Sequence, residues 1–156
     1  MKTILLALIV ILTNCNLYGK FTTSEHSRLA IHQINTLGKQ LLFIVSDNEL
    51  NVYKIESNDK SIADTILLYT KKKLKYESDL NYLLPSLQNL DSFYENQVLD
   101  GVVWYIVYDN NQTQKKIYIH HYYVPEVERI FKVFNKEIPR SKQRYIYLLT
   151  DYACWE

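Results

Sequence analysis

The chain has 156 residues, 47% hydrophobic and 22% charged, a composition typical of one globular domain with a single core. Its three glycines are isolated from one another, which excludes the clustered glycines of phosphate-binding loops and so argues against Rossmann and P-loop chemistry. A formal net charge of +1 gives little drive for nucleic-acid binding through phosphate neutralisation.

The first nineteen residues have the layout of a secretory signal peptide. Lys2 gives a short positive start, residues 4–12 are uninterrupted apolar residues, and a polar stretch follows. The apolar run is too short to cross a bilayer as a stable helix. We therefore expect residues 1–19 to be a signal peptide and residues 20–156 to form a single exported domain. That domain would be neutral, because residues 1–19 contain one Lys and no acid and leave 17 basic and 17 acidic residues.

Two routes of signal removal fit the sequence. Leu12 stands three residues before Cys15, as in a bacterial lipoprotein signal, although Asn14 replaces the small residue that usually precedes the cysteine. Cleavage after Gly19 is the alternative. Either route places the mature chain outside the cytoplasm: in the periplasm, anchored to the outer membrane or secreted. A lipid on Cys15 would be its membrane attachment, and Cys154 would have no disulfide partner within the chain.

The mature chain is predicted to begin with a helix over residues 22–38. Its apolar residues recur at helical spacing, and Gly38 offers a C-terminal stop. A hairpin of two strands follows, at residues 41–46 and 50–56. Residues 61–73 suit either a helix or a strand, and we favour a helix.

Residues 79–94 carry leucines at helical spacing and are predicted to be helical, with a kink or a division into two short helices at Pro85. The clearest element is a hairpin of strands at residues 101–109 and 115–124, both rich in β-branched and aromatic residues around a polar loop.

A helix is predicted to start at Pro125, a residue suited to the first helical position, and to end before Pro139. Phe131 and Phe134 are expected to anchor its apolar face in the core. A last strand is predicted at residues 144–150. The order α-β-β-α-α-β-β-α-β indicates an α+β fold, a mostly antiparallel sheet with helices packed on one face. The other face would meet solvent or a partner.

The stretch "IHHYYVPEVE" at residues 119–128 resembles a metal site only at first sight. Adjacent strand residues point to opposite faces, so His120 and His121 cannot bind one metal ion on a regular strand. No metal-binding spacing such as H-E-x-x-H occurs in the chain. We therefore expect neither a metal nor a cofactor.

The strand ending at residue 124 has two unequal faces. Ile117 and Ile119 mark the core side, so Tyr118, His120 and Tyr122 share the opposite side. Tyrosines of the neighbouring strands would extend this group into a stripe. The candidate binding residues are therefore Tyr105, Tyr118, His120, Tyr122, Tyr145 and Tyr147. The alternative is that the stripe packs beneath a loop.

These observations favour a small exported, non-catalytic binding protein of the bacterial cell envelope, of an inhibitor or immunity kind. Its partner would be a protein or a glycan and not nucleic acid. The alternative is a small secreted hydrolase acting on envelope or extracellular polymers, in which Asp100 and His120 would be the candidate groups. The Asp-Gly pair at residues 100–101 is more simply explained as a turn. The oligomeric state is open at this stage.

Overall fold

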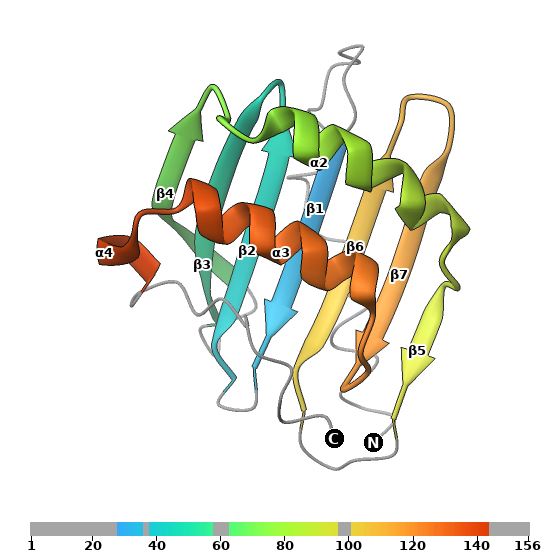
Figure 1. The fold of residues 1–156 in the computed structure, drawn as a ribbon. Helices are drawn as coiled ribbons and strands as arrows, with labels where there is room; N and C mark the ends of the chain where they lie inside the picture. Colours follow the sequence, from blue (N-terminus) through green and yellow to red (C-terminus); the bar gives the residue numbers. More distant parts are fainter. Residues whose placement is uncertain (1–27, 36–37, 58–62, 97–100, 144–156) are drawn as a thin grey trace.

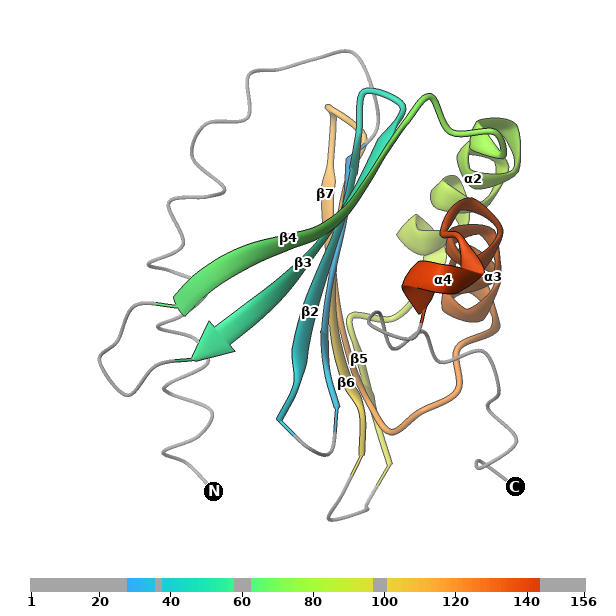
Figure 2. The same cartoon turned by 90° about the vertical axis from the view of Figure 1, so that its left-hand side faces the viewer.

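The computed structural model describes residues 28–35, 38–57, 63–96 and 101–143. They form an α+β fold of two layers, a seven-stranded sheet and a helical layer against one of its faces (Figures 1 and 2). The strand order is β4-β3-β2-β1-β6-β7-β5. The described helices all lie on the same side of the sheet, and we call the opposite side the open face.

The first four strands form an antiparallel meander: β1 (Arg28–Ile34), β2 (Gln40–Ser46), β3 (Glu49–Ser57) and β4 (Ala63–Lys72). Asp47 and Asn48 form the turn between β2 and β3, both with positive φ, as a tight hairpin turn requires. The predicted hairpin in this region is confirmed.

The other half of the sheet contains β5 (Phe93–Glu95), β6 (Val103–Asp109) and β7 (Gln114–His120). β6 joins the halves by pairing with both β1 and β7 in antiparallel fashion, which confirms the predicted β6–β7 hairpin. β5 pairs with β7 in parallel, so the sheet is mixed. Our prediction of the sheet missed this pairing, because three residues are too few to give a strand pattern.

β1 replaces the described part of the helix that we predicted at residues 22–38; residues 22–27 lie outside the described residues. Leu29, Ile31 and Gln33 point toward the helical layer and are at most 2% exposed, which is a period of two. β1 is the central strand and packs between β2 and β6. The helical spacing in this segment was therefore coincidental.

β4 likewise replaces the helix that we favoured at residues 61–73. It pairs with β3 along its length, but Val52 is opposite Tyr69 whereas Tyr53 is opposite Leu67. Leu68 is therefore an extra residue, a β-bulge. Figure 2 shows the β3–β4 hairpin turning away from the rest of the sheet. With β1 and β4 as strands, four strands precede the first described helix, and the predicted element order is wrong there.

The helical layer consists of α2 (Glu77–Leu83), the 3-10 helix η2 (Leu84–Asn89), α3 (Pro125–Glu137) and α4 (Arg140–Gln143). The predicted division at Pro85 is confirmed, because α2 gives way to η2 there. α3 begins at Pro125 as predicted, and the Val124 carbonyl accepts hydrogen bonds from the next turn. The strand predicted at residues 144–150 lies outside the described residues.

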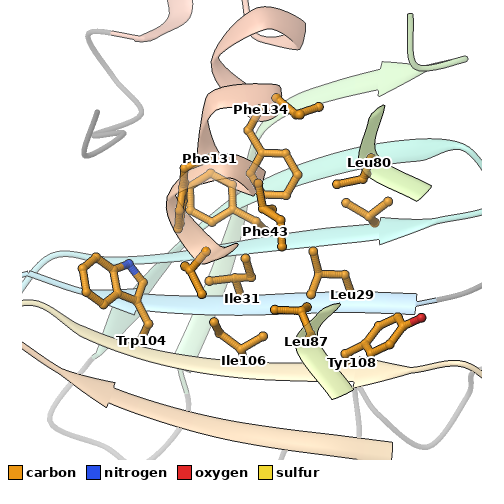
Figure 3. Packing of buried hydrophobic residues seen from close by; sticks show 14 of the residues in the cluster. Leu29, Ile31, Phe43, Leu80, Leu87, Trp104, Ile106, Tyr108, Phe131 and Phe134 are labelled. Atoms are coloured by element: carbon orange, nitrogen blue, oxygen red, sulfur yellow. The ribbon is translucent and has the colours of Figure 1, made fainter. Parts of the chain in front are cut away.

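The core between the layers is built around aromatic rings (Figure 3). Phe43 on β2 meets Phe131 edge-on at 5.4 Å and stacks with Phe134 at 5.6 Å between ring centroids. Trp104 on β6 lies 6.5 Å from Phe131. Phe131 and Phe134 are each 1% exposed, so the prediction that they anchor α3 in the core is confirmed.

The buried carboxylate of Glu137 connects the end of α3 to the start of α2. Glu137 is 6% exposed, and its carboxylate accepts a hydrogen bond from the backbone N–H of Tyr76, just before α2. Its backbone carbonyl accepts a hydrogen bond from the Tyr69 hydroxyl of β4 at 3.0 Å. One residue thus links α3, α2 and the sheet.

Candidate binding surface

Strand alternation divides the side chains of β6 and β7 between the two faces. The residues that point toward the helical layer are buried: Trp104, Ile106, Tyr108, Ile117 and Ile119. The residues between them point to the open face and are partly exposed, among them Tyr105, Tyr118 and His120. This division confirms the predicted faces for residues 117–120.

Strand register aligns one residue from every strand into a line across the open face, which we call the central row. Each member is directly opposite the next on the neighbouring strand: Leu67, Tyr53, Leu42, His32, Tyr105, Tyr118 and Phe93. Six strand spacings of about 4.8 Å make the row roughly 30 Å long. Leu42 and His32 in its middle are buried, whereas Leu67 and Phe93 at its ends are 54% and 59% exposed.

The rings of the central row pack against one another across the strands. Phe93 and Tyr118 stack nearly parallel with centroids 5.1 Å apart, Tyr118 and Tyr105 are 5.0 Å apart, and Tyr105 and His32 are 6.2 Å apart. Tyr118 therefore lies between two rings, with Phe93 stacked on it and the Tyr105 ring tilted by 58° against it.

The side chains of Tyr105, Tyr118 and His32 in the central row are uncharged at neutral pH. Burial raises the pKa of Tyr105 to about 12, and the neighbouring Tyr118 adds to this shift. Burial also raises the pKa of Tyr118, with a smaller contribution from Glu95. Burial lowers the pKa of His32 and so favours the neutral imidazole. The hydrogen bond to the Gln40 side chain at 3.0 Å opposes this shift but is the smaller effect.

The rows on either side of the central row give the open face an apolar middle and a polar rim. Six aliphatic residues, all partly exposed, flank the row: Ala30, Ile34, Ile44, Ile55, Val103 and Val107. The charged side chains described on this face lie at its perimeter: Glu49, Lys72, Glu95, Asp109 and Lys116. An apolar centre inside a polar rim is the usual anatomy of a protein–protein interface.

One polar pair stands beside the central row. His120 and Glu95 are opposite each other on β7 and β5, with Nδ1 and Oε1 3.5 Å apart. Their side chains are 18% and 49% exposed. The carboxylate can orient the imidazole and leave Nε2 directed away from it, as a hydrogen-bonding group for a ligand.

Tyr122 does not join the other candidate residues. β7 ends at His120, and His121 has a φ of 48°, which breaks the strand alternation. The ring of Tyr122 packs 5.3 Å from Tyr94, whose position opposite Ile119 places it on the helical side. A Cβ on Gly101 would lie 2.6 Å from the His121 Cβ, so glycine leaves the room that this turn needs.

The structure therefore brings Tyr105, Tyr118 and His120 together. Tyr145, Tyr147 and Cys15 lie outside the described residues, as does Asp100, the acid of the hydrolase hypothesis. The sequence pattern did not point to the other ring-bearing members of the row, His32, Tyr53 and Phe93. Strand alternation around His32 would have revealed it had residues 28–34 been recognised as a strand.

Within the described ranges, no three His, Cys, Asp or Glu side chains gather closely enough to hold a metal ion. Across those same ranges, the helices are too short or too polar to span a membrane. A scan of the chain against models of known protein families finds no match, and a search of curated proteins finds no similar sequence either.

Proposed function

We propose that the chain is a small exported, non-catalytic binding protein of the bacterial cell envelope, of an inhibitor or immunity kind, that holds a protein partner on its open face. The observation that carries the proposal is the aromatic and aliphatic middle of this face, with the charged side chains at its perimeter. The signal-like residues 1–19 support export.

The geometry of the rings favours a protein over a glycan. Sugars stack on exposed ring faces, whereas Tyr118 has Phe93 stacked on it and Tyr105 beside it. A row roughly 30 Å long suits the patch of about 800 Å² that each partner contributes to a standard protein interface. Half-buried tyrosines are frequent anchors of such interfaces.

A hydrolase is the second candidate, and the His120–Glu95 pair is the observation that favours it. An imidazole oriented by a carboxylate is half of a nucleophile-activating arrangement. Its open-face neighbours on β6 and β5, Val103 and Glu95, supply no hydroxyl or thiol. The neighbouring ring on β7, Tyr118 at 6.5 Å, carries a phenol whose pKa is raised by burial, which disfavours it as a nucleophile. The pair is therefore better suited to hydrogen bonding at the rim of a binding surface.

Site-specific photo-crosslinking tests the proposal. A photoreactive amino acid replaces Tyr118 on the open face or Tyr82 on α2, which is 85% exposed on the helical layer and serves as the control. Both variants are produced in cells, and adducts are identified by mass spectrometry. We expect one protein to be captured from position 118 and not from position 82. Equal capture from both positions, or none from 118, would contradict the proposal.

The alternatives give different results in the same preparation. Retention on isolated envelope glycan, without a protein adduct at position 118, would indicate a glycan partner. Hydrolysis of envelope polymers that is lost in His120→Ala would indicate the enzyme.

A further inference from the structure

The outer edge of β4 is a second candidate for molecular contact, on a different part of the molecule from the central row. β4 has ten residues and ends the sheet on one side, with no further strand beyond it among the described residues (Figure 1). Near its middle, Ile66 and Leu67 are adjacent and 44% and 54% exposed. A long edge strand with exposed apolar residues can act as a template for another strand.

We propose that β4 pairs antiparallel with β4 of a second copy of this chain, over its full length. In this register Ala63 is opposite Lys72 of the second copy, and the two-fold axis passes between Leu67 and Leu68. The two seven-stranded sheets then form one continuous sheet with both helical layers on the same side.

The bulge at Leu68 makes this register consistent. A two-fold axis perpendicular to the sheet keeps the open faces together, so opposite residues must share a face. Before the bulge, Thr65 points to the open face with Ile55; after it, Thr70 does so with Asn51. In a regular strand, residues five apart would point to opposite faces. Because the bulge adds one residue between them, both threonines point to the open face, and Thr65 is opposite Thr70 of the second copy there.

The same register matches the chemistry of the two strands. Asp64 is opposite Lys71, Ile66 is opposite Tyr69, and Thr65 is opposite Thr70, each pair occurring twice. Opposite charges, an aromatic residue with a β-branched one, and paired threonines are the cross-strand combinations that stabilise antiparallel sheets.

Self-complementarity favours a second copy over an unrelated strand. A regular strand would not follow the bulge and twist of β4, whereas an identical strand has both in matching positions. Pairing also places the two Leu67 side chains near the axis on the open face, where they cover each other and join the two central rows. The proposal does not depend on the function proposed above.

Sedimentation velocity of the full-length protein, with charge-swap variants, tests the pairing. We expect the wild type to form a dimer. Asp64→Lys and Lys71→Asp should each dimerise roughly tenfold more weakly, because each variant places like charges opposite one another twice. An equimolar mixture of the two variants should recover the wild-type affinity, because both positions then hold opposite charges, one pair reversed and the other as in the wild type.

Two control variants outside β4 and one apolar-to-charged variant within it complete the test. Asp91→Lys and Lys142→Asp change the same charges at exposed positions outside β4 and should leave the dimer unchanged. Ile66→Asp should abolish it without unfolding the chain, since this side chain is partly exposed. A monomeric wild type, a dimer unaffected by the β4 variants, or a mixture that stays dissociated would each overturn the proposal.

Discussion

The two faces of one sheet differ in how they use aromatic residues. On the covered face, Phe43 and Trp104 are at most 1% exposed and pack against α3. On the open face, the rings of Tyr105 and Tyr118 remain partly exposed and pack mainly on one another. The same strands therefore provide stability on one side and leave a partly exposed aromatic surface on the other, so the two sides should respond differently to substitution.

The largest expected effect is on the covered face. Phe131→Ala should lower the free energy of unfolding by about 3–5 kcal/mol, because it leaves a cavity among three aromatic rings. Tyr82→Ala, which truncates an exposed ring on α2, should change it by less than about 0.5 kcal/mol. Denaturant unfolding measures both. Similar values for the two variants would mean that α3 does not form the core.

A second test concerns the buried carboxylate of the same layer. Glu137→Ala should cost about 1–3 kcal/mol, because it leaves the part-buried Tyr76 N–H without its acceptor. Glu126→Ala, in the first turn of the same helix and partly exposed, is the control and should cost less. The same unfolding measurement distinguishes them, and equal costs would show that the Glu137 contact contributes little.

The smallest expected effect on stability comes from His32 on the open face and depends on pH. Burial lowers the pKa of His32 below its usual value of 6.5, so the unfolded chain binds a proton there at a higher pH than the folded chain. Stability is therefore lost as the pH falls below about 6.5 and levels off below the folded pKa.

His32→Gln removes this titration and retains a hydrogen-bond donor for Gln40. Unfolding curves at pH 7 and below should show that the wild type loses more stability on acidification than the variant. Parallel losses in the two proteins would contradict the proposed burial of a neutral imidazole.

Local signals predicted the β6–β7 hairpin and α3 correctly. Alternating β-branched and aromatic residues define the hairpin, and Pro125 marks the first helical position. β1 was not predictable in this way, because a central strand buries residues on both faces and its apolar positions also fit a helical spacing. This segment forms a strand because it pairs with β2 and β6, which lie far apart in the sequence.

The candidate surface was predicted only where the strands were recognised. Tyr105, Tyr118 and His120 followed from alternation on β6 and β7. Phe93 was missed because β5 has three residues and is defined by its pairing with β7 alone. Tyr122 was assigned to the stripe because the sequence does not reveal the positive φ at His121 that ends the alternation.

The most direct test of the open face as a binding surface is the affinity of Tyr118→Ser for the protein captured by crosslinking, compared with that of Tyr82→Ser. We expect Tyr118→Ser to remain folded and to bind at least about thirtyfold more weakly, the loss typical of an interface anchor. Tyr82→Ser should bind like the wild type, although it truncates the more exposed tyrosine. Equal affinity of the two variants, or a Tyr118→Ser chain that fails to fold, would contradict the assignment of the open face as a binding surface.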